Sequence, residues 1–366
     1  MTPPAVSVCA RYMTLPDDGD ERAAAWICRR RQLRLVAIFA LPLWWALITL
    51  APTKQELSPY APEWILIVVP FSASILLAQT ISCRSDRDLL GRNWTGVDVL
   101  KLGTYGTVSF TVPLLLVAVA VDDGFDHNLA AIAWLMASGV FALFGGALLR
   151  YAEGFKPRGI KGGPLYKRAT VLAKSMDIHL RQVSVVPFGR GRLTNAFGGP
   201  NGIAVTDDYG HWLHGAQLDS VIAHELAHIK HNDVRKKFTA IVTFFAAPVA
   251  LAFTFPGLSS TPRFLFDLAA LLIPLAFYYF LMRRREYAAD RVAAEFTDPR
   301  TTSGALTSLY NHVGVPENST PLMEAFSTHP SLKNRLRAIA KVALAAGIGL
   351  PETVEKSANP ASTHRF

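Results

Sequence analysis

Long apolar runs dominate the N-terminal part of this chain. They lie at 35–51, 64–82, 102–121 and 129–149. Because roughly 20 mostly apolar residues are enough for a helix to cross a bilayer, we expect four transmembrane helices here. The charged stretch before the first run has no long apolar core, which predicts a partly disordered segment rather than a cleaved signal peptide.

Two further apolar runs, 238–255 and 264–282, interrupt the more polar remainder of the chain. They carry few charges, Asp267 among them. A hairpin of two membrane-spanning helices is therefore favoured over its alternatives, which are buried core helices or a re-entrant hairpin.

Strand and helix patterns alternate in the polar regions on either side of that hairpin. A helix at 164–176, a strand at 183–186 and a strand pair at 195–206 precede an amphipathic helix that begins near Ala216. The region after the hairpin is mostly helical, so the two regions together predict a small α+β domain. The expected segments are an N-terminal segment (1–34), a four-helix region (35–149), a first polar region (150–237), the hairpin (238–282), a second polar region (283–350) and a flexible tail (351–366).

Composition and charge agree with a membrane setting. Hydrophobic residues make up 51% of the chain and charged residues 18%. Lys and Arg cluster before the first apolar run, between the second and third, and after the fourth, whereas the loop between the third and fourth carries only acidic charges, at Asp122, Asp123 and Asp126. This distribution predicts a multi-pass membrane protein with cytoplasmic termini and cytoplasmic polar regions. The expected location is the plasma membrane of a prokaryote.

The same topology accounts for the net charge of +9, so no nucleic-acid partner is needed to explain it. The expected partners are the lipid bilayer and protein or peptide substrates. The sequence does not indicate an oligomeric state.

The stretch His224-Glu225-Leu226-Ala227-His228 has the pattern H-E-x-x-H within the predicted amphipathic helix. Residues four apart share a helix face, so the imidazoles of His224 and His228 can bind one Zn²⁺ at about 2.0–2.1 Å each. Glu225 follows the first ligand and is placed to accept a proton from water beside the metal. The pattern therefore predicts a hydrolase with one Zn²⁺ per chain, and two histidines on one helix by accident are the less favoured interpretation.

A catalytic zinc site needs a third protein ligand and keeps a fourth position open. Glu286 and Asp290 lie four apart in R-R-R-E-Y-A-A-D, so one carboxylate can bind zinc while the other accepts the free N–H of a ligand histidine. Taken alone, this segment fits a solvated amphipathic helix with Arg–Glu pairs even better. His231 is a rival ligand, but it is rotated off the zinc-facing side of the helix.

The stretch H-E-L-A-H-I-K-H-N-D, which ends at Asp233, resembles the active-site helix of HtpX-like membrane zinc proteases, a family that also includes the CAAX prenyl proteases. R-R-x-E-Y-x-A-D, which ends at Asp290, resembles the helix of that family's third ligand. Two weaker matches are Asn195-Ala196-Phe197 with the strand 202–206, and Thr328-His329-Pro330-Ser331 with Arg335 following. All four occur in family order and cover nearly half of the chain.

The resemblance implies a multi-pass α-helical membrane protein with a small α+β zincin-type metalloprotease domain. It implies the zinc ligands His224, His228 and Glu286, the base Glu225, and Asp290 as the hydrogen-bond partner of a ligand. It implies less directly that His329 or Arg335 steadies the transition state. The family's usual plan has two spans before the catalytic helix, whereas four are expected here, which weakens any inference about substrates.

Three residues of the predicted strand pair complete the expected site. Asn195, Ala196 and Phe197 are the candidate edge strand that pairs with an extended peptide and holds its scissile bond over the metal. An ordinary turn-flanked hairpin is an equally good interpretation of the local sequence.

Three functions are consistent with these features. The first is a membrane metalloendopeptidase that cleaves membrane or misfolded proteins at the cytoplasmic face. The second is a signalling protease of the antibiotic-sensor type, although the expected outside loops are short. The third is a non-catalytic membrane scaffold with a structural zinc, which the intact Glu225 and the three expected ligands disfavour, because structural sites usually have four ligands.

Overall fold

The computed structural model places part of the chain well enough to describe. The described residues are scattered positions from 72 to 140, and 157–186, 196–199, 202–207, 209, 213, 215–254, 260–313, 324–325 and 327–349. The chain divides into two compact units, Met1–Gly154 with Phe238–Leu275, and Phe155–Lys237 with Ala276–Phe366. The candidate site residues all belong to the second unit, so that unit positions the chemistry.

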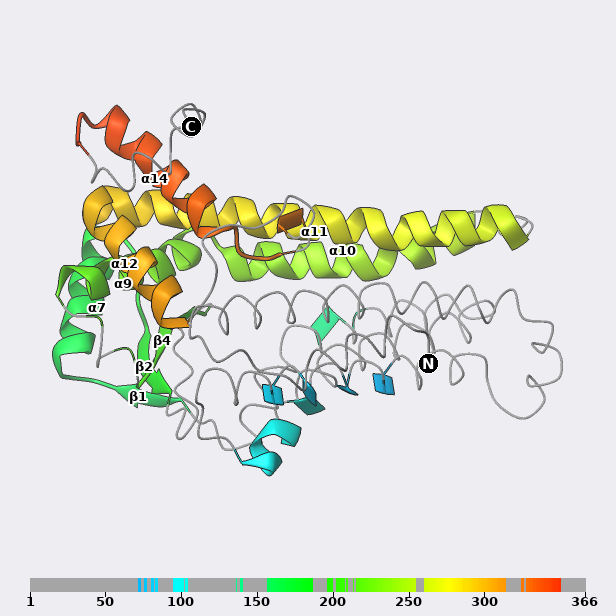
Figure 1. The fold of residues 1–366 in the computed structure, drawn as a ribbon, viewed down its shortest axis with the longest axis horizontal. Coiled ribbons are helices and arrows are strands. Elements are labelled where there is room, and N and C mark those ends of the chain that lie inside the picture. The colour runs from blue at the N-terminus through cyan, green and yellow to red at the C-terminus, as the bar shows by residue number, and fades with distance from the viewer. Residues whose placement is uncertain are drawn as a thin grey trace, which may run out of the picture. The chain divides into compact units, whose positions relative to one another are not determined.

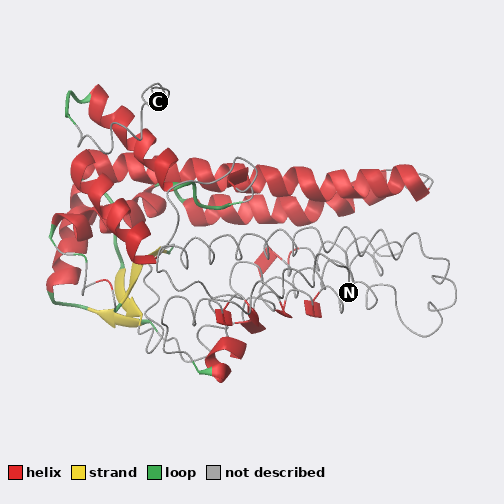
Figure 2. Ribbon diagram, in the orientation of Figure 1, coloured by secondary structure: helices red, strands yellow, loops and turns green. Residues whose placement is uncertain are grey.

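Four short strands form one mixed sheet in the second unit (Figure 2). The strands are β1 (Arg158–Ile160), β2 (Gln182–Val186), β3 (Ala196–Gly198) and β4 (Gly202–Thr206). Their spatial order is β1-β2-β4-β3, with β2 and β4 parallel and the outer strands antiparallel to their neighbours. The predicted strand at 183–186 is confirmed as part of β2, and the predicted strand pair is confirmed as β3 and β4.

Helices α7 (Pro164–Ser175) and α9 (Ala216–Lys230) pack against this sheet (Figure 1). Val183 and Ile203 are paired across β2 and β4 and therefore share one face of the sheet. Both are buried in a core with Ala169 of α7 and with Ile222 and Leu226 of α9. Both helices match the sequence-based expectation, because their apolar residues recur at helical spacing.

A second core joins the helices at the C-terminal side of the unit. Helices α12 (Pro299–Val313) and α14 (Leu332–Ala345) pack on each other. The buried residues of this core are Ala294, Leu306, Tyr310, Leu332, Leu336 and Ile339. This packing fixes α14 against the end of α11 (Ser260–Phe296), which contains Ala294.

The hairpin region is longer and more continuous than the sequence pattern predicts. Helix α10 runs over Asp233–Thr254, and α11 is one uninterrupted helix over Ser260–Phe296. The apolar run 264–282 and the segment that carries Glu286 thus belong to the same helix. No glycine or proline lies between Leu275 and Phe296 to end the helix earlier.

Of the four predicted apolar runs, 35–51 lies outside the described residues, and 64–82, 102–121 and 129–149 are described only at scattered positions. Within the described part of the chain, no helix is both long enough and apolar enough to span a membrane.

Candidate metal centre

Helix α9 carries His224, Glu225 and His228. Gly215 precedes the helix at φ 55°, a left-handed conformation that glycine adopts without a steric penalty. The side of α9 that contains Ile222 and Leu226 is buried in the core. Because this side is fixed against the sheet, His224 and His228, four residues apart, are held together on another face of the helix.

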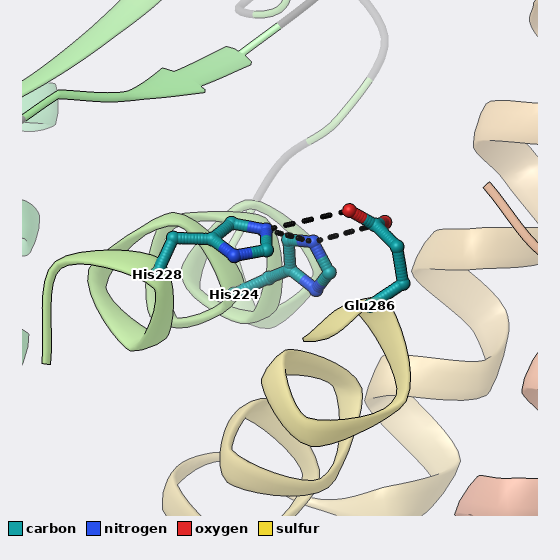
Figure 3. Close-up of side chains that lie close together, drawn as sticks. All are labelled: His224, His228 and Glu286. Atoms are coloured by element: carbon teal, nitrogen blue, oxygen red, sulfur yellow. Dashed lines mark hydrogen bonds and ion pairs between the residues drawn. The ribbon is translucent and has the colours of Figure 1, made fainter. Parts of the chain in front are cut away.

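The two imidazoles meet the carboxylate of Glu286 (Figure 3). The Nε2 atoms of His224 and His228 lie 3.2 Å apart. The Nε2 atom of His224 lies 3.7 Å from Oε2 of Glu286, and that of His228 lies 3.6 Å from Oε1. The structure thus brings together the three side chains that the sequence predicts as metal ligands.

Each histidine also has a carboxylate on its other ring nitrogen. Nδ1 of His224 lies 3.0 Å from Oδ1 of Asp290, and Nδ1 of His228 lies 2.8 Å from Oδ2 of Asp233. A carboxylate accepts a hydrogen bond, so both Nδ1 atoms carry the proton and both Nε2 atoms present a lone pair. In this tautomer both Nε2 atoms and the carboxylate of Glu286 can donate lone pairs to one cation.

The donor atoms and their spacing fit Zn²⁺. Two imidazole nitrogens and one carboxylate oxygen are a zinc ligand set, and ligands at about 2.0–2.1 Å in tetrahedral directions lie about 3.3–3.4 Å apart. The two imidazole nitrogens lie 3.2 Å apart, and each lies 3.6–3.7 Å from a different oxygen of Glu286. One ligand atom from each of the three residues lies within 4.8 Å of the other two, so all three side chains can reach one ion. Within the described residues, the group contains these three side chains, which is the number of protein ligands in a catalytic zinc site.

Glu286 is held in its charged form despite its burial. Only 8% of the residue is exposed, and burial alone raises the pKa of its carboxyl. His329, Arg335 and His224 outweigh that effect and keep the pKa of Glu286 well below its ordinary value. The ionised carboxylate is the form that binds a metal.

Asp290 is paired with Arg335 of α14 in the interior of the unit. Nε and Nη2 of Arg335 donate to Oδ2 and Oδ1 of Asp290 at 2.7 and 2.6 Å. Burial alone raises the pKa of Asp290, but Arg335 and His224 lower it below its ordinary value. The ion pair compensates the buried charges of Asp290 and Arg335, and Asp290 still accepts a hydrogen bond from the ring of His224.

Glu225, the predicted base, lies beside strand β3. A Cβ atom built on Gly198 is 2.8 Å from the backbone oxygen of Glu225 and 3.4 Å from its Oε2. Only a residue without a side chain therefore lets β3 approach α9 this closely. The strand that was predicted to hold substrate thus passes directly beside Glu225.

The other predicted site residues are His329, the strand segment 195–197 and the rival ligand His231. His329 is exposed, and its Nδ1 lies 2.9 Å from Oε2 of Glu286. Ala196 and Phe197 are in β3 and pair with Val205 and Ala204 of β4, whereas Asn195 lies outside the described residues. The rival ligand His231 is the C-cap residue that follows α9 and is not part of the ligand group.

Comparison with known proteins agrees with this geometry. The profile of peptidase family M48 matches residues 163–343. A protease HtpX homolog of Pyrococcus abyssi is 30% identical over 216 residues, which cover 48% of this chain and 72% of the relative. A protease HtpX homolog of Campylobacter hominis is 27% identical over 232 residues, which cover 53% of this chain and 80% of the relative.

The chain belongs to peptidase family M48. With its His-His-Glu group it is a zinc metallopeptidase, which confirms the predicted enzyme class. The crystal structure of Ste24p from S. mikatae aligns with a TM-score of 0.52 at 18% identity and covers 86% of this chain and 84% of that one. At this identity the match supports the fold alone, and that fold agrees with the predicted zincin-type α+β domain.

Sequence reasoning missed several residues that build the M48 site of this chain. Asp233 lies on His228, and Arg285 donates to the backbone oxygen of Asp233 at 2.9 Å. Nη1 of Arg283 donates to the backbone oxygens of Glu324, Ala325 and Ser327, in the segment that leads to His329. The available signal was the run R-R-R-E itself, which was interpreted as part of the third-ligand motif or as a solvated helix with Arg–Glu pairs, with no role for its arginines in the site.

Proposed function

We propose that this M48 peptidase is an integral-membrane endopeptidase that cleaves membrane or misfolded proteins at the cytoplasmic face of a prokaryotic plasma membrane, with one Zn²⁺ per chain. The observation that carries the metal assignment is the convergence of two imidazole lone pairs and one buried carboxylate. The membrane setting rests on the apolar runs and on the one-sided distribution of Lys and Arg in the sequence.

His224, His228 and Glu286 hold the metal in this proposal, and Asp290 keeps the ring of His224 in its binding tautomer. Zinc in such a site polarises the substrate carbonyl and lowers the pKa of water. An uncharged substrate peptide thereby becomes open to attack at neutral pH.

Glu225 moves the proton. It follows His224 on α9, and its carboxylate lies near the β3 backbone at Gly198. In the proposed reaction Glu225 accepts a proton from the attacking water and then gives it to the leaving amine. Because one residue takes up and releases the same proton, its loss stops cleavage without removing a metal ligand.

Two further elements are assigned to the substrate. An extended peptide is proposed to run along the strand that contains Ala196 and Phe197, with Asn195 preceding it, because this strand passes beside Glu225. His329 is exposed next to Glu286 and is proposed to donate a hydrogen bond to the carbonyl oxygen under attack.

The test compares the full chain with its Glu225→Gln variant, both purified in detergent. Zinc content is measured by mass spectrometry, and cleavage of casein and of the chain itself is followed over time. We expect equal zinc and at least about a 100-fold loss of cleavage in the variant, which is the size of a typical general-base contribution. Cleavage that persists in the variant would remove Glu225 from its role, and zinc without cleavage in the unchanged chain would favour a scaffold.

The membrane setting has its own test. Reporter fusions at the loop around Asp123 and at the C-terminus distinguish the two sides of the membrane. We expect the loop fusion to report the outside and the C-terminal fusion the cytoplasm. Both fusions on one side, or a chain released from membranes by alkaline carbonate, would refute this part of the proposal.

A further inference from the structure

We propose that Asp233 and Arg285 form a second positioning pair of the metal centre, which sets the ring of His228 as Asp290 and Arg335 set the ring of His224. This inference rests on the proposed zinc function and deepens it. It assigns a role to two residues on opposite sides of the 238–275 insertion.

The contacts on His228 carry the inference. Oδ2 of Asp233 lies 2.8 Å from Nδ1 of His228, which is shorter than the 3.0 Å between Asp290 and His224. Asp233 is buried, with 8% of its surface exposed. A buried carboxylate at this distance fixes the proton on Nδ1 and leaves Nε2 free to bind a metal.

Arg285 supplies the matching cation. Its Nη1 donates to the backbone oxygen of Asp233 at 2.9 Å, and its Nε lies 3.6 Å from Oδ1. Arg285 therefore holds both the backbone and the side chain of the residue that faces His228. Without this cation, the buried carboxylate of Asp233 is left with an uncompensated charge.

Asp233 is also the first residue of α10, which suggests a simpler role. An aspartate there stabilises a helix by its charge or by capping backbone N–H groups. The described contacts of the carboxylate do not go to the helix, because Oδ2 is used by His228 and Oδ1 has no hydrogen-bond partner within the described part of the chain. The side chain is therefore committed to the histidine rather than to the helix.

The local backbone explains why Asp233 reaches His228 at all. Helix α9 ends at Lys230, and Asn232 adopts φ 53°, a left-handed conformation that asparagine tolerates better than most residues. This left-handed residue separates α9 from α10, and the carboxylate of Asp233 lies against the ring five positions earlier. The polypeptide then leaves the unit after Lys237 and returns at Ala276, so the Asp233–Arg285 contact joins the two ends of the insertion.

The two pairs differ in a way that predicts their relative strength. Arg335 makes two hydrogen bonds of 2.7 and 2.6 Å to the carboxylate of Asp290. Arg285 makes one ion pair at 3.6 Å to the carboxylate of Asp233. Replacement of Arg285 should therefore disturb the metal site less than replacement of Arg335. It should also disturb the site less than replacement of Asp233, which contacts His228 directly.

The experiment measures zinc binding directly, without a peptide substrate. The full chain and the variants Asp233→Asn and Arg285→Lys are purified, and their zinc dissociation constants are determined by competition with a chromogenic chelator. Asp219→Asn is the matched control. It also removes an Asp–Arg ion pair, the 2.7 Å contact between Asp219 and Arg168, but Asp219 is not a partner of a metal ligand in the described contacts. Cobalt absorption spectra and melting of the metal-free forms complete the set.

We expect Asp233→Asn to weaken zinc binding about 10- to 100-fold and to change the cobalt spectrum. We expect a smaller weakening in Arg285→Lys, and no change in zinc affinity or spectrum in the control. If Asp233→Asn does not fold, Arg285→Lys decides the question by the same two measurements.

Unchanged zinc affinity and an unchanged cobalt spectrum in Asp233→Asn would overturn the inference. A loss of zinc affinity in Asp233→Asn that is no larger than in Asp219→Asn would overturn it too.

Failure of the proposed function would give a different result. In that case the unchanged chain itself binds no zinc, or its zinc affinity is insensitive to Glu286→Ala.

Discussion

Arg335 holds both carboxylate oxygens of Asp290, at 2.7 and 2.6 Å, in the interior of the catalytic unit. The same Asp290 lies 3.0 Å from Nδ1 of His224. Arg335 of α14 thus holds the carboxylate of Asp290, and that carboxylate orients the ring of His224 on α9. The helical C-terminal part of the chain is therefore a component of the metal centre.

Arg335→Ala should destabilise the metal-free protein by about 3–5 kcal/mol, because it leaves the buried charge of Asp290 unpaired. Arg335→Lys should recover only part of this loss, because lysine cannot form the two parallel hydrogen bonds. The measurement is denaturant unfolding of the metal-free chain. Arg337→Ala, on the same helix but outside this pair, is the control, and equal losses in both alanine variants would contradict the assignment.

Asp290 should also make the stability of the metal-free chain depend on pH. Its folded-state pKa is lowered, so its stabilising effect is complete above the unfolded value of about 3.9 and is lost as the pH falls through the lower folded value. Unfolding free energies measured between pH 6 and pH 3 should therefore fall more steeply below about pH 4 in the unchanged chain than in Asp290→Asn. Identical slopes would show that folding does not lower the pKa of Asp290.

Gly198→Ala should impair the enzyme through the contact between β3 and α9. The added Cβ would lie 2.8 Å from the backbone oxygen of Glu225, so one of the two elements must move. We expect a stability loss of about 1–3 kcal/mol, typical of an overpacked site, and reduced cleavage with zinc retained. Gly162→Ala is the control, because a Cβ atom added at Gly162 has no neighbour within 4 Å, and it should behave like the unchanged chain. If Gly198→Ala also behaved like the unchanged chain, the contact between β3 and Glu225 would be contradicted.

Glu286→Gln should weaken zinc binding, because the neutral amide lacks the charge of the third ligand while keeping its size. His329→Ala should retain zinc, because His329 contacts Glu286 but is not part of the ligand group. Zinc content after dialysis at neutral pH separates the two variants. Equal retention of zinc in both would exclude Glu286 as a ligand.

The sequence predicts the part of the site that lies within one periodic element. His224 and His228 are four residues apart on a helix, so their shared face follows from helix geometry alone. Strands β2, β3 and β4 are likewise short apolar stretches with local signals. Glu286 is separated from the histidines by the insertion, so it could be linked to them only by the need for a third ligand, its spacing from Asp290 and its likeness to a known family.

The sequence does not predict contacts that depend on tertiary packing. Arg283 and Arg285 look like a surface charge cluster, yet the structure has them donating to backbone oxygens at 2.6–3.2 Å. Asp233 was noted only as the end of a motif, because no periodicity relates it to His228 across a left-handed turn. The continuity of α11 was missed because its hydrophobicity changes at residue 283 although its helical propensity does not.

Zinc K-edge X-ray absorption on the purified chain tests the central assignment most directly. We predict a first shell of nitrogen and oxygen at about 2.0–2.1 Å with two imidazoles, one imidazole fewer in His228→Ala, and little bound zinc in Glu286→Ala. Sulfur in the first shell, or a spectrum that is unchanged in both variants, would show that the metal is not held by His224, His228 and Glu286.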